Sequence, residues 1–271
     1  MHGLSADIGR RNWSKARSSR IKLRIHSYVL RIDGLNILID ACNGNHKVRS
    51  VPCANGLQTP WLDVPGGFGL RPEKVDMVLC TPLHADDVGW NTQLQDCHWC
   101  RPFPKARYVS ARAEYEHLMH ASGEGEAFHH EAFLDSVVPV VKSGLAGLVE
   151  TDHLVHREIG AGIWLEDFHG HSAGLVAIHA ERGGWHAMFT GDCFHHPIQM
   201  IRPDLHFFAD EDGPAAAGQR RKLFDANADR YISLFPAHFR GSVCRTYPER
   251  RRCVPFRIHG RRLNALPRIN G

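Results

Sequence analysis

The sequence has 271 residues, of which 43% are hydrophobic and 23% are charged. This composition excludes a mainly disordered chain, because it supplies enough apolar side chains for a large core. No stretch reaches the roughly 18 uninterrupted apolar residues of a membrane-spanning helix, so we expect no membrane partner. The 20 histidines make a metal site worth looking for.

Charge is distributed unevenly along the chain. Residues 1–31 contain eight Lys or Arg and one acidic residue, and residues 240–271 contain nine Arg and one acidic residue. Residues 32–239, between these ends, contain 27 acidic and 16 basic residues. The basic ends are solvated and partly frayed, or lie back on the acidic body, or form a surface that binds polyanions. Because the acidic centre repels phosphate, nucleic acid is not expected as a partner.

The eight cysteines are scattered, and the first twenty residues lack the apolar segment of a secretory signal. We therefore expect a cytoplasmic protein with reduced thiols. Cys97 and Cys100 form a Cys-x-x-Cys pair, but a structural zinc site needs a second pair of ligands at suitable spacing. We interpret the pair as incidental thiols in a loop and leave its role open.

In the first part of the chain, residues 21–32 largely alternate apolar and polar side chains, which predicts a half-buried strand. Asp33-Gly34 then predicts a hairpin turn, and residues 35–40 predict the returning strand. Residues 43–70 are rich in Asn, Gly and Pro, which indicates a long irregular loop. Loops of this length are often functional, so we expect this one to help bind the substrate.

The rest of the chain predicts more strands than helices. A helix is expected to begin at Ser110 and run to 120, and a second one over 126–139 should end before Pro139. The remaining predicted elements are strands at 75–80, 163–166, 174–180, 185–190 and 231–235, and a helix at 214–227. Strands in both halves with helices between them favour two sheets covered by helices over a doubly wound parallel sheet.

Four short segments place a His or an Asp just beyond an apolar strand. They are residues 81–92, 168–174, 189–197 and 235–239. Loops that follow different strands can meet at one rim of a sandwich and form a single polar site.

These four segments, in this order along the chain, resemble the motifs of the metallo-β-lactamase-fold hydrolases, in particular those of the branch with quorum-quenching lactonases and methyl parathion hydrolase-like enzymes. The signature of that family is His-x-His-x-Asp-His, a Gly-His-Ser/Thr turn, a Gly-Asp pair and a final His. Further matches are Leu38-Ile39-Asp40, the run 88–92 and the run 195–199 after Gly191-Asp192. The resemblance covers roughly residues 22–240 and implies a four-layer αββα sandwich with a metal site between the sheet edges. We expect a basic segment at 1–20, this domain at 21–240 and an Arg-rich segment at 241–271 whose packing is open.

The resemblance also implies a set of metal ligands. One cation would be held by His84, His171 and the bridging Asp192, and the other by Asp86, Asp192 and His238. The chain departs from the signature twice. Pro82 stands where the family has its first His, and proline offers no side-chain donor atom. Asp87 stands in place of the last His of the motif.

These departures change the expected metal chemistry. The first site keeps two imidazoles and a shared carboxylate, which is a minimal set for zinc. With Asp87, the second site has three carboxylates and one imidazole, and oxygen-rich sites favour manganese or iron(II). The resemblance implies one or two zinc ions, and we expect weaker zinc binding than in a complete family member.

The implied activity is hydrolysis of a small lactone, ester or phosphoester by a metal-activated water. Asp86 or Asp87 would orient that water or accept its proton, although Asp87 could also be a ligand or an inert loop residue. Substrate contacts are expected near Trp90. His195 and His196 lie close to the motif and, like His169, are interpreted as packing or surface residues. The alternative is a catalytically impaired protein that keeps the fold for binding. A homodimer is a further possibility.

Overall fold

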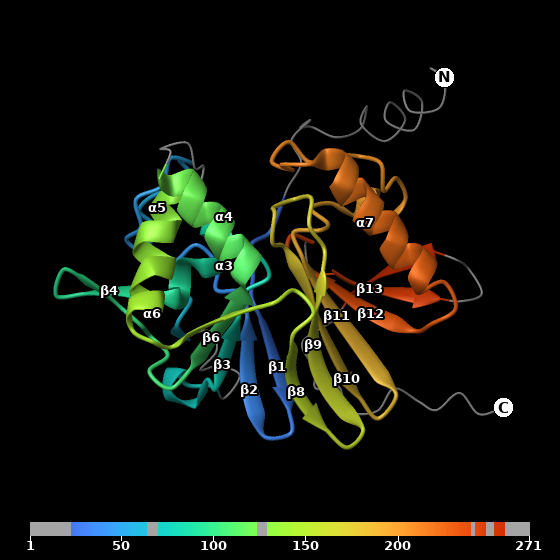
Figure 1. Ribbon diagram of the computed structural model, residues 1–271, viewed down its shortest axis with the longest axis horizontal. Helices are drawn as coiled ribbons and strands as arrows, with labels where there is room; N and C mark the ends of the chain where they lie inside the picture. The colour runs from blue at the N-terminus through green and yellow to red at the C-terminus, as the bar shows by residue number, and fades with distance from the viewer. Residues whose placement is uncertain (1–22, 64–69, 124–128, 240–241, 248–251, 258–271) are drawn as a thin grey trace.

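The computed structural model describes residues 23–63, 70–123, 129–239, 242–247 and 252–257. It contains two large sheets that face each other, with helices on both outer sides (Figure 1). The first sheet has the strand order β1-β2-β3-β6-β7. Its strands are β1 (Tyr28–Ile32), β2 (Leu35–Ile39), β3 (Met77–Leu79), β6 (Arg107–Ala111) and β7 (Ala146–Val149). Only β1 and β2 are antiparallel, and the other neighbours in this sheet are parallel.

The second sheet has the order β14-β13-β12-β11-β10-β9-β8. Its strands are β8 (Leu154–Glu158), β9 (Ala161–Asp167), β10 (Val176–Arg182), β11 (Trp185–Gly191), β12 (Ile232–Pro236), β13 (Ser242–Tyr247) and β14 (Arg252–Arg257). Only β11 and β12 pair in parallel. Strands β9, β11 and β12 therefore end at the same edge, which is the edge that carries the predicted site residues.

The alternation of side chains along the strands builds three apolar layers. Ile37 and Ile39 of β2 point between the two sheets, whereas Leu38 points to the helices that cover the first sheet. In β11, Phe189 lies between the sheets and Met188 lies under the helix on the other side. Period-2 alternation with both faces apolar is what a sheet buried on both sides requires.

Helices α4 (Arg112–Gly123), α5 (His130–Ala132) and α6 (Val138–Lys142) cover the first sheet, and α7 (Gly213–Ala226) covers the second (Figure 1). The four-layer αββα sandwich is thus confirmed. The shorter elements are the α-helical turn α3 (Ala85–Val88), the 3₁₀ turns η1 (Pro72–Lys74), η2 (Gly89–Asn91) and η4 (Pro197–Met200), and the π-helix η3 (Phe133–Val137). Of the described helices, none combines the length and the apolar character needed to cross a bilayer.

Several predicted elements are confirmed with shifted ends. The hairpin turn has φ of 50° at Asp33 and 83° at Gly34, the positive values that a type I′ turn requires. The helix predicted from Ser110 begins later, because Ser110 belongs to strand β6. The prediction that the next helix ends before Pro139 is wrong: α6 starts at Val138 after a π-turn. Pro139 then lies in the first turn, where its missing N–H removes no helical hydrogen bond.

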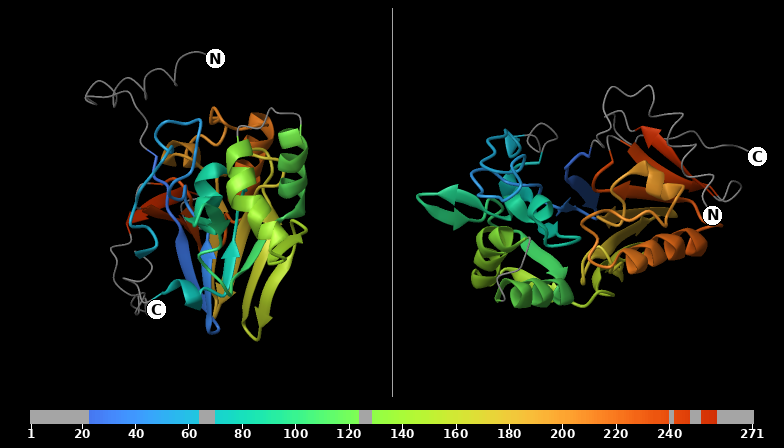
Figure 2. Two further views of the ribbon diagram at one scale, coloured as in Figure 1. Left: turned by 90° about the vertical axis from the view of Figure 1, so that its left-hand side faces the viewer. Right: turned by 90° about the horizontal axis from the view of Figure 1, so that it is seen from above.

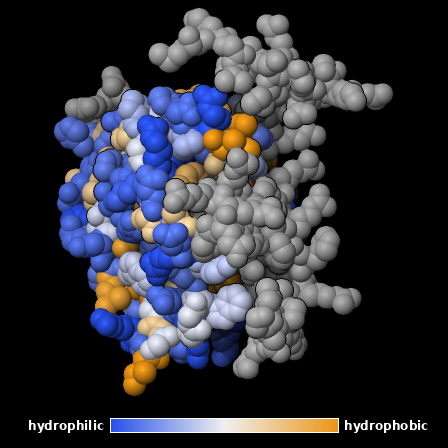
Figure 3. Space-filling view, turned by 90° about the vertical axis from the view of Figure 1, so that its right-hand side faces the viewer, coloured by the Kyte–Doolittle hydropathy of each residue, from blue (hydrophilic) through white to orange (hydrophobic). Residues whose placement is uncertain are grey.

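Two surface features complete the fold. Strands β4 (Gln93–Gln95) and β5 (His98–Cys100) form a hairpin that projects from the body (Figure 2). The exposed Cys97 lies in its turn, and both Cys97 and Cys100 are free thiols. The described part of the face that carries α7 is mainly hydrophilic, with separate apolar side chains (Figure 3).

Candidate metal centre

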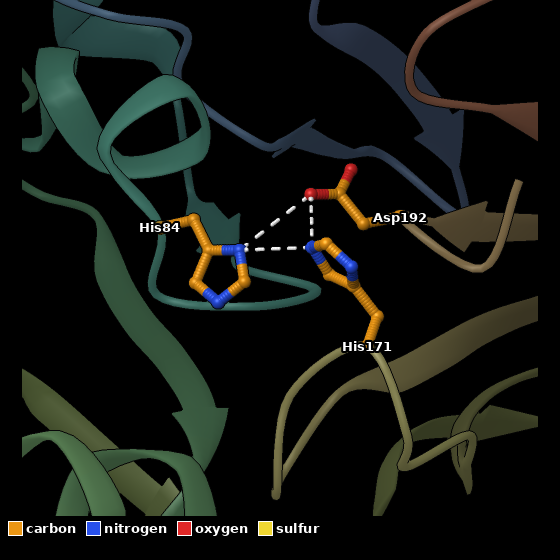
Figure 4. A group of neighbouring side chains, drawn as sticks. All are labelled: His84, His171 and Asp192. Carbon is orange, nitrogen blue, oxygen red and sulfur yellow. Dashed lines mark hydrogen bonds and ion pairs between the residues drawn. The ribbon is translucent and has the colours of Figure 1, made fainter. Parts of the chain in front are cut away.

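Four loops bring His84, His171, Asp192 and His238 together at the common strand edge. His84 precedes α3, His171 lies between β9 and β10, and the other two follow β11 and β12. All four residues are buried, with at most 4% of their surface exposed. Their side chains point toward a common centre, as Figure 4 shows for the first three. The structure therefore brings residues from all four predicted segments to one place.

The centre on the first side is a triangle of two nitrogens and one oxygen. His171 Nε2 lies 3.2 Å from His84 Nδ1 and 3.2 Å from Asp192 Oδ2. His84 Nδ1 lies 3.6 Å from the same oxygen (Figure 4). Three donor atoms at this spacing can share a proton or surround a small cation.

The far side of each imidazole is held by an acceptor. His171 Nδ1 donates to Asp210 Oδ1 at 2.9 Å, and His238 Nδ1 donates to the carbonyl of Arg24 at 3.1 Å. His84 Nε2 lies 3.6 Å from Glu114 Oε1. Because Nδ1 carries the hydrogen in His171 and His238, the Nε2 lone pair of each neutral ring points into the centre. Such outer acceptors fix the ring and the tautomer of metal-binding histidines.

Glu114 of α4 joins the two loops that carry His84 and His171. Its carboxylate accepts hydrogen bonds from Leu83 N (3.3 Å), Ser172 Oγ (2.8 Å) and Gly174 N (2.8 Å). A Cβ on Gly174 would lie 2.2 Å from the backbone nitrogen of Glu114, so the close approach requires glycine. Glu114 thus sets the distance between the two imidazoles.

Asp210 is the second functional carboxylate that sequence reasoning missed. Its side chain is fully buried and also accepts from Phe207 N at 2.9 Å, while Arg220 Nη2 lies 3.9 Å away. His129 was missed as well. Its ring stacks on His84 at 3.9 Å between centroids, and its Nδ1 accepts from Ala85 N–H. No local sequence pattern marks these three residues, since their partners are far away in the chain.

The other side of Asp192 is richer in oxygen. Asp192 Oδ1 lies 2.8 Å from His238 Nε2, which is 3.8 Å from Asp86 Oδ2. Asp86, Asp87 and Asp192 each place an oxygen within 4.8 Å of the other two. Asp87 Oδ2 is buried and has no hydrogen-bond partner among the described residues.

Behind the site, Asp40 and Gly191 support the loop that carries Asp192. Asp40 accepts from the backbone N–H and the hydroxyl of Thr81, at 2.8 and 2.9 Å. Gly191 has φ of 48°, and a Cβ there would lie 2.3 Å from Thr81 Oγ1. The glycine of the Gly-Asp pair is therefore required both by backbone conformation and by space.

No protein-family model matches the sequence, and a search of curated proteins finds no match. Solved structures do resemble it. A probable metal-dependent hydrolase from Staphylococcus aureus has a TM-score of 0.76 at 16% identity, over 97% of this chain and 91% of that one. The hydrolase AbOPH of the beta-lactamase superfamily has a TM-score of 0.73 at 20% identity, over 94% and 86%. The dizinc quorum-quenching lactonase AidC has 0.70 at 18% identity, again over 94% and 86%.

The chain has the metallo-β-lactamase fold. In this fold the predicted residues His84, His171, Asp192 and His238 lie at one centre, with Asp86 and Asp87 on its oxygen-rich side. His195 also lies at the centre, with Nε2 3.9 Å from Asp192 Oδ2. His169 is half-exposed and pairs with Asp167 at 2.7 Å, while His196 caps η4. Trp90 is buried and stacks on Trp61, so its ring packs in the core.

Burial and mutual repulsion give the carboxylates of this centre different pKa values. Burial raises the pKa of Asp87 well above its usual value, and the neighbouring Asp192 and Asp86 raise it further. The pKa of Asp86 is raised for the same reasons. Asp192 is the exception. Burial opposes its ionisation, but His238, His171 and His84 outweigh burial and hold its pKa well below the usual range. Asp192 is therefore the permanent anion of the site.

The negative charge of Asp192 raises the pKa values of two of the imidazoles. Burial disfavours the charged form of His171, yet Asp192 and Asp210 raise its pKa to about 10. Burial and Asp192 compete in the same way at His238, where the pKa rises to about 9. In the metal-free protein, protons on these two rings thus balance the carboxylate charge. A cation would take the place of those protons.

The donor set fits a metal ion. Among the described residues, four groupings of His and acidic side chains have ligand atoms within 4.8 Å of one another, and all four lie at this centre. Asp87 Oδ2 is buried and has no hydrogen-bond partner among the described residues, and Asp192 Oδ1 is paired with His238 Nε2 at 2.8 Å. Nitrogen and oxygen donors of this kind suit zinc, manganese and iron(II).

Proposed function

We propose that the protein is a metal-dependent hydrolase that acts on a lactone, ester or phosphoester. The observation that carries this proposal is the convergence of His84 Nδ1, His171 Nε2 and Asp192 Oδ2 within 3.2 to 3.6 Å. Two of these atoms belong to imidazoles whose opposite edges face buried carboxylates. Acceptors arranged in this way present nitrogen lone pairs to one point, which is how metal-binding histidines are oriented.

His84, His171 and Asp192 would hold one cation, and Asp86, Asp87, Asp192 and His238 surround the place for another. When bound, the metal supplies Lewis acidity and lowers the pKa of a coordinated water. Zinc is expected from the fold, while the carboxylates around Asp87 favour manganese or iron(II) at the second position.

The chain's own residues supply orientation and proton transfer. Asp210 and the Arg24 carbonyl hold the tautomers of His171 and His238. Glu114 fixes the spacing of the two loops on the first side. The pKa of Asp87 is raised by burial and by Asp192, and its Oδ2 has no hydrogen-bond partner among the described residues, so in its ionised form it can accept a proton at Oδ2 during attack on the substrate. Asp86, which is less buried, is the other candidate base.

Two of the similar structures support a small-molecule substrate. AidC was solved with the product N-hexanoyl-L-homoserine, and AbOPH is a hydrolase of the same superfamily. We propose a small molecule with a lactone, carboxyl ester or phosphoester bond. The loop after β2, at residues 41–63, is the candidate for substrate contacts. A cytoplasmic location and a homodimer remain predictions.

The test is a substrate panel on protein loaded with zinc, manganese or iron(II). N-hexanoyl-homoserine lactone, a p-nitrophenyl ester and a p-nitrophenyl phosphotriester represent the three classes. At least one should be turned over by the wild type and not by Asp192→Asn. Asp204→Asn, on the exposed surface, is the matched control and should keep full activity. Hydrolysis that survives in Asp192→Asn would show that the centre is not responsible.

One observation favours the alternative of an impaired, binding-only protein: Pro82 and Asp87 replace two imidazoles of the family motif. If none of the three substrates is hydrolysed, thermal denaturation with N-hexanoyl-homoserine distinguishes a protein that binds such a molecule without turnover from one that does not bind it. A rise in melting temperature that Asp192→Asn abolishes would indicate binding without turnover.

A further inference from the structure

His195 is a buried imidazole at the metal centre that the proposed ligand set does not use. It follows β11, three residues after Asp192, and only 3% of its surface is exposed. Its backbone N–H donates to Gln199 Oε1 at 2.8 Å. Its ring stacks on Phe207 at 3.7 Å and on His238 at 4.8 Å between centroids, with interplanar angles of 13° and 14°. The ring is thus fixed in place from both backbone and side chain.

Neither nitrogen of the His195 ring has a hydrogen-bond partner among the residues that the structure describes. Nε2 lies 3.9 Å from Asp192 Oδ2, beyond hydrogen-bond distance. Nδ1 is buried and has no partner among the described residues. A buried polar atom without a partner is costly, so its presence calls for a ligand.

We propose that His195 is a metal ligand, and that Asp192, His195 and His238 form the second cation site of this protein. Each of the three offers a donor atom within 4.8 Å of the other two. Asp86 Oδ2 lies 3.8 Å from His238 Nε2 and borders the same site. The inference deepens the proposed function and rests on it, because it requires that the centre holds metal.

The competing groupings are less suitable. In the set of His171, His195 and Asp210, the atoms that would face the cation are already engaged: His171 Nδ1 donates to Asp210, which also accepts from the backbone of Phe207. In the set of Asp86, Asp87 and Asp192, three carboxylates, two of them buried, repel one another and no imidazole is present. Asp192, His195 and His238 combine one anion with two neutral donors.

This assignment changes the expected metal. The sequence suggested three carboxylates and one imidazole at the second position, which favours manganese or iron(II). Two imidazoles and one carboxylate are instead a common protein ligand set for zinc. The second site should therefore take up zinc or cobalt(II) in preference to manganese.

The experiment measures metal stoichiometry and affinity in wild type, His195→Phe and a control. Phenylalanine keeps a flat ring against Phe207 and removes both nitrogens. His186→Phe is the same exchange at another buried histidine, on the outer face of the second sheet. Zinc is titrated against a chelator, cobalt(II) absorption reports the coordination, and elemental analysis gives the equivalents. His195→Gln, which keeps a polar side chain, is the second variant if His195→Phe does not fold.

We expect two equivalents in the wild type and in His186→Phe. His195→Phe should keep the first and bind the second more weakly, by more than the roughly 10–100-fold caused by loss of an outer hydrogen-bond partner. Two equivalents with unchanged affinity in His195→Phe would overturn the inference and leave the proposed function intact. A single equivalent in the wild type would also overturn it. No metal in the wild type would overturn both.

Discussion

Among the described residues, two clusters combine buried histidines with a carboxylate, and one of them, around Asp192, resembles a metal site. On the outer face of the second sheet, Glu166 Oε2 lies 2.8 Å from His179 Nε2, and His179 Nδ1 lies 2.8 Å from His186 Nε2. Trp164 stacks on His179. This outer cluster has the same residue types as the centre around Asp192, yet it forms a chain.

The difference lies in where the nitrogens point. His179 is bonded through opposite edges of its ring, so Glu166 and His186 are on different sides and cannot share a cation. At the centre, acceptors such as Asp210 occupy only the outer edge of the ring, and the inner lone pairs converge on Asp192. Buried histidine therefore indicates a metal only when a second partner holds the far nitrogen and leaves the near one directed at a common point.

The largest expected effect is that of Asp192→Asn. In the proposed centre, Asp192 would be the anion shared by both cation positions, so we expect metal affinity to fall by more than about 100-fold, beyond the range for outer partners. Glu166→Gln removes the carboxylate of the outer cluster and should leave metal content unchanged. Elemental analysis of both variants tests the contrast. Equal metal content in Asp192→Asn and the wild type would refute the role of the centre.

A double variant, Pro82→His with Asp87→His, restores both imidazoles of the family motif. We expect zinc affinity and hydrolytic rate to rise, each by roughly tenfold or more, because an added neutral donor strengthens a minimal zinc site. Chelator competition and initial rates measure the two effects. If both stay flat, positions 82 and 87 do not face the metal and the ligand assignment carried over from the family is wrong.

Asp210→Asn should have an intermediate effect. An amide can donate to His171 Nδ1, which would place the ring hydrogen on Nε2 and turn it toward Asp192. We expect zinc affinity to fall by about 10–100-fold, while the wild-type stoichiometry is reached at high metal concentration. The exposed Asp204→Asn is the control for charge. An unchanged zinc affinity in Asp210→Asn would show that the tautomer of His171 does not depend on this carboxylate.

The smallest expected effect is a pH dependence of stability that has opposite signs in the two clusters. Burial, aided by His179 and Arg230, lowers the pKa of His186 to about 4 in the folded protein. The unfolded chain then binds this proton more tightly, so the stabilisation is complete above pH 6.5 and is lost as pH falls toward 4. In the metal-free protein, His171 and His238 have raised pKa values. Their contribution is complete below pH 6.5 and is lost as pH rises through about 9 to 10.

Urea unfolding of metal-free wild type and His186→Phe at pH 7 and 4.5 measures the first part. We expect the variant to lose less stability on acidification, by about 1–3 kcal/mol. The same loss in both proteins would show that His186 does not resist protonation in the folded state.

Much of the fold and part of the site could be predicted from local patterns. Period-2 alternation located β1, β2 and the strands that precede the site, and Asp33-Gly34 specified its turn. The Gly-Asp pair at 191–192 could be recognised from the sequence, because the backbone conformation at this position requires glycine. The predicted helix end before Pro139 was wrong, because a π-turn allows the next helix, α6, to start at Val138, just before the proline.

What escaped prediction depends on long-range contacts. In the sequence, Glu114 looks like an ordinary helix residue, because its partner Ser172 is 58 residues away and reaches it only in the folded chain. Asp210 lies 39 residues from His171 in sequence. The stacking of His195 on Phe207 and His238 also could not be read from spacing, although His195 lies only three residues from Asp192.

The central claim is that the converging donors around Asp192 hold metal, and its most direct test is the metal content of the purified protein. Elemental mass spectrometry is done first without added metal and then after soaking with zinc and with manganese. The structure predicts bound transition metal, rising to two equivalents with zinc and absent in Asp192→Asn. A wild-type protein that contains no metal even after soaking would contradict the account.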